Sequence, residues 1–328
     1  MATYKGIKGV KVVTKASDPT ASEAAGTVWY NSTSPSALKY SIAGAGAWAS
    51  GNDMNTARAH MAVSVMAPTS TSLAAAGNAP PGYQNATELY DGTSWATSPA
   101  TVNTARRGAG GIGTVNTACI IAGGNTPPAT DICESFNGST WTEVNNLTTA
   151  RKGLQPGGAG SSTAGLLSGG ASGPGTVQKV SESWDGTSWS EENDMVTARE
   201  SGAQFGTSTA SIWAGGYTTT YVTTVESWNG TSWTAVNSLN TARAWYAGTG
   251  ITTGGLVFGG DAPPFVAITE SYDGSSWTEV GDLGTARHSQ GGTGGSNTSA
   301  ISFGGVAATA TTEVWSDPTY TIKTVTVS

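Results

Sequence analysis

The chain has 328 residues, only 11% of them charged, and its formal net charge is −7. Glycine is abundant at 46 residues, but 12 tryptophans and 10 tyrosines exclude a disordered chain, which has few large aromatic side chains to bury. No run of about 18 apolar residues exists to span a membrane, the acidic balance disfavours a nucleic-acid footprint, and two cysteines do not make a disulfide scaffold.

The first 47 residues differ from the rest of the chain in charge. Lys5, Lys8, Lys11 and Lys15 lie in a stretch of 15 residues without an acid, whereas the remainder is strongly acidic. These lysines are a candidate anchor for an acidic partner, and a solvated tail is an equally good interpretation. Because no apolar core follows Met1, we expect no signal peptide.

Short predicted β elements follow within residues 1–47. They occupy Val10–Ala16, Gly26–Thr33 and Leu38–Tyr40. This segment resembles β elements of phage tail-fibre and related virion proteins. In that family such a segment precedes a receptor-binding or decorating part, so the resemblance implies an attachment role for residues 1–47.

A repeat of about 44 to 48 residues then dominates the chain. Thr-Ala-Arg occurs six times, ending at Arg58, Arg106, Arg151, Arg199, Arg243 and Arg287. After each arginine come a small-Gly pair and then a glutamate, at Glu88, Glu134, Glu182, Glu226, Glu270 and Glu313. An aromatic residue stands two positions beyond each glutamate, and in five copies an Asp-Gly or Asn-Gly pair then leads to a tryptophan.

Each repeat predicts four short strands, which we call a to d in chain order. Strand a follows the arginine, strand b ends at the glycine pair, strand c carries the glutamate and strand d begins at the tryptophan. The Asp-Gly or Asn-Gly pair between c and d is a strong hairpin signal, because its tight turn needs positive φ. Such a unit cannot bury both faces alone, and radial stacking of the units gives a β-propeller.

The motifs also resemble the kelch repeat. Gly123-Gly124, Phe136-Asn137-Gly138, Trp141 and Thr149-Ala150-Arg151 show the pattern in one stretch, and the resemblance covers residues 48–316. It implies a propeller fold and says almost nothing about function.

Ring closure can be predicted as well. The sixth a–b–c set ends at Trp315 without a following turn and tryptophan, whereas Trp48 precedes the first arginine much as Trp95 precedes the second. We therefore expect an all-β fold with six four-stranded blades over residues 48–316, in which the strand at Trp48 supplies strand d of the last blade. The remaining run in residues 317–328, which alternates from Tyr320, could pair with Ile7–Val13.

The repeated arginines and glutamates have two interpretations. They could form a binding ring, or each arginine could pair with a glutamate or with backbone carbonyls to hold the strands in register. Side chains present in every blade serve what every blade needs, so we favour the structural interpretation.

The b–c loops differ most between repeats, so binding is expected there. They carry an aromatic set that we predict to be exposed and suited to stacking on sugars or docking on protein: Tyr83, Tyr217, Tyr221 and Phe265. Simple drift of loop sequence is an equally good interpretation.

The residues just after each arginine vary too, among them His60, Arg107, Lys152, Glu200 and Trp245. A small polar or anionic ligand could bind there, although we favour a solvated rim.

Catalytic and metal-binding patterns are missing from the sequence. Galactose oxidase also carries kelch-like blades, but copper oxidase chemistry needs several imidazole and tyrosine ligands, and only His60 and His288 are present. No zinc spacing, Ser-His-Asp constellation or phosphate loop is evident. We therefore expect no enzyme and no cofactor.

Cys119 and Cys133 are predicted to lie nearly opposite each other on strands b and c, as buried thiols or, less favoured, as a disulfide.

These observations predict a bacteriophage virion structural protein: a tail-fibre, neck or capsid-decorating appendage, present in multiple copies. It would be made in the host cytoplasm. Its expected partners are other virion proteins and a host-surface glycan or protein, with no nucleic acid and no membrane insertion. The alternative is a carbohydrate- or protein-binding propeller without a virion role, and a galactose-oxidase-like enzyme is least favoured.

Overall fold

The computed structural model describes residues 12–19, 27–33, 37–43, 46–80, 82–306, 310–317 and 320–324. These residues form strands and turns without a helix, and none of them belongs to a helix that could cross a membrane. The chain divides into two compact units, one comprising Met1–Gly46 with Asp317–Ser328 and the other comprising Ala47–Ser316.

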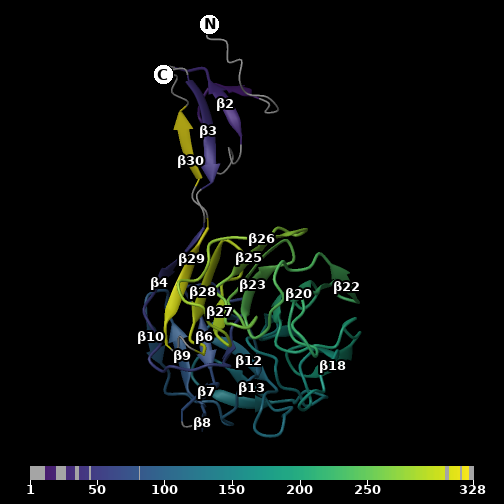
Figure 1. The fold of residues 1–328 in the computed structure, drawn as a ribbon. Helices are drawn as coiled ribbons and strands as arrows, with labels where there is room; N and C mark the ends of the chain where they lie inside the picture. Colours follow the sequence, from purple (N-terminus) through teal and green to yellow (C-terminus); the bar gives the residue numbers. More distant parts are fainter. Residues whose placement is uncertain are drawn as a thin grey trace. The chain divides into compact units, whose positions relative to one another are not determined.

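Within its described residues, the larger unit contains six four-stranded antiparallel sheets arranged as a β-propeller (Figure 1). The innermost strands are β5 (Ala62–Val63), β11 (Gly110–Val115), β15 (Ala159–Ser161), β19 (Ala203–Gly206), β23 (Ala247–Ile251) and β27 (Gly291–Thr293). Each contacts the innermost strands of the two neighbouring sheets, and β27 contacts β5, so the ring is closed.

Three further strands complete each sheet outward. Second in order are β6 (Leu73–Ala75), β12 (Ala118–Ala122), β16 (Ala164–Ser168), β20 (Ser211–Ala214), β24 (Gly254–Phe258) and β28 (Ser299–Phe303). Third are β9 (Thr87–Tyr90), β13 (Cys133–Phe136), β17 (Ser181–Trp184), β21 (Val225–Trp228), β25 (Thr269–Tyr272) and β29 (Thr312–Ser316). Outermost are β10 (Trp95–Thr97), β14 (Trp141–Val144), β18 (Trp189–Glu192), β22 (Trp233–Val236), β26 (Trp277–Glu279) and β4 (Ala47–Ser50). A small hairpin, β7 (Asn78–Ala79) and β8 (Gly82–Tyr83), lies in the first b–c loop.

The predicted ring closure is confirmed. Strand β4 pairs with β29 in the last sheet, with Trp48 opposite Trp315. The ends of the larger unit therefore meet in one sheet, as the position of Trp48 in the sequence predicts.

Tryptophans on the outermost strands bind neighbouring sheets together. The indole N–H of Trp141 donates to Thr87 Oγ1 at 2.9 Å, that of Trp233 donates to Ser181 Oγ at 3.0 Å, and that of Trp95 donates to Thr312 Oγ1 at 3.1 Å across the ring closure. The core is therefore the set of interfaces between sheets, where these buried indoles are both packed and hydrogen-bonded.

Each repeated arginine forms an ion pair with the glutamate of its own repeat, and both side chains are buried. Arg199 Nη2, for example, lies 2.9 Å from Glu226 Oε1, and Arg199 also donates to the carbonyl of Thr224. The Glu226 carboxylate accepts the backbone N–H groups of Val196 and Thr197. The pair thus attaches the link between two sheets to strand c, and all twelve repeated side chains are engaged in such ion pairs.

The smaller unit contains one four-stranded sheet of β1 (Val13–Lys15), β2 (Val28–Asn31), β3 (Ala37–Ala43) and β30 (Tyr320–Thr324), in that order. Trp29 and Leu38 are buried. Asp18 accepts from Trp29 and Asn31 and pairs with Lys39, and the hydrogen bond from Lys39 is the main cause of a lowered pKa at Asp18.

The C-terminal strand β30 pairs with β3 of the N-terminal segment, with Tyr40 opposite Lys323. Of the expected partner run Ile7–Val13, residues 7–11 lie outside the described residues, and Val13 pairs with Trp29 of β2. The expected pairing of the two cysteines is wrong. Cys119 lies opposite Phe136, and Cys133 lies opposite Ala122, because the b–c loop folds about a later centre than assumed. The register offsets the two cysteines by about three residues along the strands, beyond the Cα separation that a disulfide can bridge, and both are free and buried. Burial raises the pKa of each thiol to about 12.

Candidate binding site over the ring of innermost strands

A belt of six left-handed residues lies where the chain enters the innermost strands. Each stands two positions after a repeated arginine, and φ at these residues lies between 54° and 68°: His60, Gly108, Gly153, Ser201, Trp245 and Ser289. A left-handed backbone suits glycine and costs other residues about 1–2 kcal/mol each. Four of the six residues bear that cost.

Backbone hydrogen bonds explain the conformation of the belt. The N–H of His60 donates to the carbonyl of Ser289 at 2.8 Å, and the N–H of Trp245 donates to the carbonyl of Ser201 at 2.8 Å. In the third repeat the donor is Leu154, which binds the carbonyl of Gly108 at 3.1 Å. The left-handed turn thus directs backbone groups from one sheet to the next, and the ring is joined at its centre as well as by its tryptophans.

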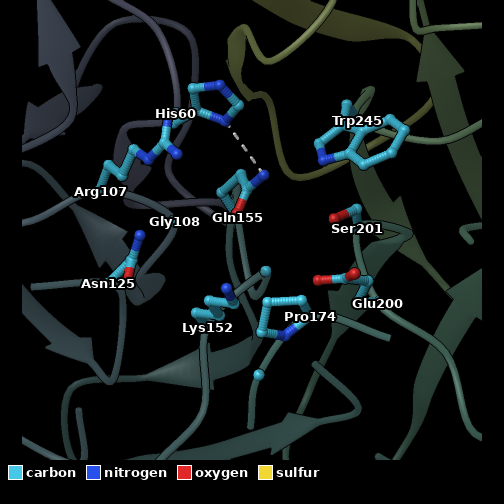
Figure 2. A pocket seen from close by; sticks show the side chains of 12 residues that line it. His60, Arg107, Gly108, Asn125, Lys152, Gln155, Pro174, Glu200, Ser201 and Trp245 are labelled. Carbon is cyan, nitrogen blue, oxygen red and sulfur yellow. Dashed lines mark hydrogen bonds between the residues drawn. The ribbon is translucent and has the colours of Figure 1, made fainter. Parts of the chain in front are cut away.

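A cavity of about 220 Å³ opens over this belt (Figure 2). Its lining comes from five consecutive repeats, through His60, Arg107, Lys152, Glu200 and Trp245 at the starts of the innermost strands. The other labelled wall residues are Gln155, the belt residues Gly108 and Ser201, and two b–c loop residues, Asn125 and Pro174. The variable residues after the arginines therefore line an open pocket, whereas from the sequence we favoured a solvated rim without one.

Two polar atoms in the wall are buried without a partner among the described residues. They are Gln155 Oε1 and Ser201 Oγ, and the two residues are 3% and 0% exposed. The amide nitrogen of Gln155 lies 3.3 Å from His60 Nδ1, as the dashed line in Figure 2 shows. A buried polar atom without a partner costs about 1–3 kcal/mol, so each of these atoms gains from a hydrogen bond with any group that reaches it.

The charged groups of the wall are of both signs. Burial, with help from Arg107 and His288, lowers the pKa of His60 to about 4, so its imidazole is neutral at pH 7. Burial also raises the pKa of Glu200, and the charge of Lys152 opposes that rise. Neither Arg107 nor Lys152 belongs to any ion pair found in the described part of the chain. Two cations therefore face the cavity together with one carboxylate.

The aromatic loop residues pack against this same rim. Tyr83 lies under the guanidinium of Arg107, 5.5 Å from the ring centroid, and its hydroxyl accepts from Asn125 at 3.1 Å. Phe265 packs on His288 with ring centroids 4.3 Å apart.

Tyr217 and Tyr221 surround the third cluster on the rim. Their ring centroids lie 5.5 and 6.1 Å from that of Trp245. The Tyr221 hydroxyl donates to Asp261 Oδ2 at 2.8 Å. Burial, followed by the bond to Asp261, raises the pKa of Tyr221 to about 12.

The expectation of an exposed aromatic set is therefore wrong for three of its four members. Only Phe265, at 39% exposed, stands out into solvent, while the tyrosines are half-buried. The reason is that each loop folds back onto the next repeat's entry strand, where its aromatic ring finds a partner. The loops and the entry positions, which the sequence presents as two candidate surfaces, form one.

The remaining predicted residues lie elsewhere. Lys15 is exposed on β1, and Lys5, Lys8 and Lys11 lie outside the described residues. No group of three or more histidine, cysteine, aspartate or glutamate side chains suited to a metal ion occurs where the chain is described.

Comparison with known proteins supports the fold alone. No family model matches the sequence, and no curated protein matches it either. Among solved structures, the chain is similar to a β-propeller described as the structure of YjhT, with a TM-score of 0.66 and 12% identity, over 83% of this chain and 99% of that one. At this identity the similarity shows a β-propeller and carries no function.

Proposed function

We propose that this chain is a bacteriophage virion structural protein of the tail-fibre, neck or capsid-decorating kind, whose propeller is of the kelch type. The observation that carries the proposal is that the chain forms two compact units, a propeller and a small sheet built from both of its flanks. Strands from both flanks of the propeller, β1, β2 and β3 on one side and β30 on the other, form one small sheet of their own, which is a suitable unit for attachment to other virion proteins.

The propeller supplies a rigid presenting unit in this proposal. Its repeated arginines and glutamates form six buried ion pairs with one another. The residues that differ between repeats are concentrated on one loop surface around the cavity. Binding residues on loops held by a rigid scaffold are the usual arrangement for recognition. We assign the protein no catalytic step.

Immunogold electron microscopy on purified particles tests the virion role. With antibody raised against the propeller, we expect gold at one fixed position on the particle, and that position identifies the tail, neck or capsid. Particles that carry no gold, although the lysate contains the protein, would overturn the proposal.

The lysines test the attachment. We expect simultaneous replacement of Lys5, Lys8 and Lys11 by glutamine to reduce incorporation into particles while the propeller stays folded. Lys179→Gln is the matched control, because Lys179 is an exposed lysine in the propeller, paired only with the partly exposed Asp194. Equal incorporation of both variants would contradict the anchor.

The second candidate is a carbohydrate- or protein-binding propeller without a virion role. The cavity with Trp245 and its neighbouring tyrosines favours it. It predicts that the triple lysine variant behaves as wild type in every binding assay and that gold is absent from particles.

A further inference from the structure

We propose that the cavity over the innermost strands is a subsite for one sugar residue carrying a carboxylate, such as a uronic acid of an acidic surface polysaccharide. The inference deepens the binding role in the proposed function and rests on it. The site itself lies within the larger unit, so its ligand can be tested without a particle.

The size of the cavity fits a single sugar ring. Its 220 Å³ is below the range of about 300–1,000 Å³ that holds drug-sized ligands. A pyranose ring with its substituents fills such a space, and neighbouring sugars of a chain would extend over the half-buried loop residues.

Trp245 is the strongest sign of a built site. It stands at a left-handed position, with φ 54°, where the equivalent residues of two other repeats are Gly108 and Gly153. A bulky side chain in that conformation is an outlier that costs about 1–3 kcal/mol, and such strain collects at binding sites. The indole lines the cavity and is held in place by Tyr217 and Tyr221.

An indole at this position provides what a sugar ring needs on its flat side. One face of a pyranose presents C–H groups, which pack on an aromatic ring, while the hydroxyls at its edge need hydrogen-bond partners. Figure 2 shows Trp245 facing the cavity from one side, with Ser201 and Glu200 beneath it and Gln155 near the middle.

The wall contains polar groups that can hydrogen-bond the hydroxyls of a sugar, and two of its polar atoms have no partner in the described part of the chain. Gln155 Oε1 and Ser201 Oγ are buried without partners among the described residues, and Asn125 and Glu200 add further polar groups to the wall. Sugar hydroxyls both donate and accept, so a wall that offers amide and hydroxyl groups suits them.

The charges select an acidic sugar over a neutral one. Arg107 and Lys152 are cationic, His60 is neutral because its pKa is lowered, and only Glu200 opposes them. The wall thus has a net positive charge in a protein whose net charge is −7. Arginine matches a carboxylate in shape, and stacking on Tyr83 holds the Arg107 guanidinium in place.

Ligand-observed NMR with two matched probes tests the proposal. Methyl β-D-glucuronide and methyl β-D-glucoside differ at one carboxylate. We expect the glucuronide to bind with a millimolar dissociation constant and the glucoside about tenfold more weakly, with the difference decreasing as salt is added. Absence of binding by either probe, or equal binding by both, would overturn the acidic-sugar site.

Trp245→Gly removes the indole and its contacts with Tyr217 and Tyr221 but also relieves the left-handed strain. Because the two effects oppose each other, we expect the variant to remain folded with a Tm close to that of the wild type and to lose at least tenfold in glucuronide affinity. Ser289→Gly is the matched control, because Ser289 is the equivalent belt residue of the sixth repeat and does not line the cavity. Equal affinities in the two variants would refute the role of Trp245.

Arg107→Gln separates the charge from the rest of the site. We expect glucuronide affinity to fall to that of the glucoside, while glucoside affinity stays the same. Loss of both affinities together would refute selection by charge. Because none of these measurements uses particles, their failure leaves the immunogold result standing, and particles without gold leave the sugar result standing.

Discussion

In four repeats the residue at the first position of strand c accepts a hydrogen bond from a neighbouring tryptophan, whereas in the fourth repeat that position holds Val225 and Trp277 donates instead to the carbonyl of Asn237. Thr87, Ser181, Thr269 and Thr312 each accept an indole N–H from the outermost strand of an adjacent sheet. In the second repeat this position holds Cys133. The indole N–H of Trp189 makes no hydrogen bond of ordinary geometry in the part of the chain that the structure describes, and it lies against the Cys133 thiol, a weak acceptor. The second repeat therefore lacks the hydroxyl acceptor that the corresponding tryptophan has in four other repeats.

Cys133→Ser should supply that acceptor. Burial raises the pKa of the Cys133 thiol to about 12, and Trp189 is among the neighbours that lower it, so the two side chains adjoin. A serine hydroxyl there would accept the indole N–H, and we expect a gain of about 1 kcal/mol in the free energy of unfolding. Urea denaturation measures it.

The matched control is Cys119→Ser, in the same sheet and equally buried. Its thiol donates to the carbonyl of Ile120 at 3.5 Å and already has the backbone N–H of Ile112 beside it, so the added hydroxyl satisfies no indole. We expect a loss of about 1–3 kcal/mol. If both substitutions destabilise the protein to the same extent, the indole at Trp189 does not lack a partner in solution.

His60 makes stability depend on pH below neutrality. Its pKa falls from 6.5 when unfolded to about 4 when folded, because of burial first and Arg107 second. Between these values the unfolded chain binds a proton that the folded chain does not, so stability falls as the pH drops from 6.5 to 4. The full effect is about 3 kcal/mol, at 1.36 kcal/mol per pH unit.

We expect His60→Asn to flatten this part of the pH profile in thermal unfolding, because asparagine does not titrate and tolerates a left-handed backbone. His288→Asn serves for comparison, since burial also lowers the pKa of His288 but Asp261 opposes it. A wild-type slope in the His60 variant would show that other groups cause the pH dependence.

Elements differ in how far the sequence determines them. The c–d hairpins are predictable because asparagine or aspartate accepts the N–H groups two and three residues ahead, as Asp185 does from Thr187 and Ser188, and the following glycine takes positive φ. Strand register across the longer b–c loops is not predictable, because the alternation of inward and outward side chains along a strand does not determine which residue of the neighbouring strand lies opposite a given one. Cys119 and Cys133 show this.

The same limit explains β30 and the cavity. Alternation from Tyr320 predicts a strand but does not name β3 as its partner. The entry positions are visible in the sequence as variable residues, and Gly108 and Gly153 hint at a special backbone. The left-handed conformation of Trp245 and the burial of Gln155 arise from packing between repeats, which no single repeat encodes.

At the scale of the whole molecule, the ring depends on strand β4 closing the last sheet. Ala49 lies opposite Val314 across this closure, and Ser190 lies opposite Ser183 at the equivalent position of the third sheet. The two pairs share their local geometry but differ in the length of chain between them, about 265 residues against about 7. Disulfide stabilisation through the unfolded state grows with that length.

An Ala49→Cys/Val314→Cys disulfide should therefore stabilise the larger unit by about 5–6 kcal/mol, and a Ser183→Cys/Ser190→Cys disulfide by about 2 kcal/mol. Each oxidised protein is compared with its own reduced form in guanidinium denaturation, which cancels the effect of the substitutions. Native Cys119 and Cys133 are buried and do not compete while the protein is folded. Equal gains would mean that the unfolded chain keeps its ends together, whereas failure of the Ala49–Val314 pair to oxidise would show that β4 does not close the ring in solution.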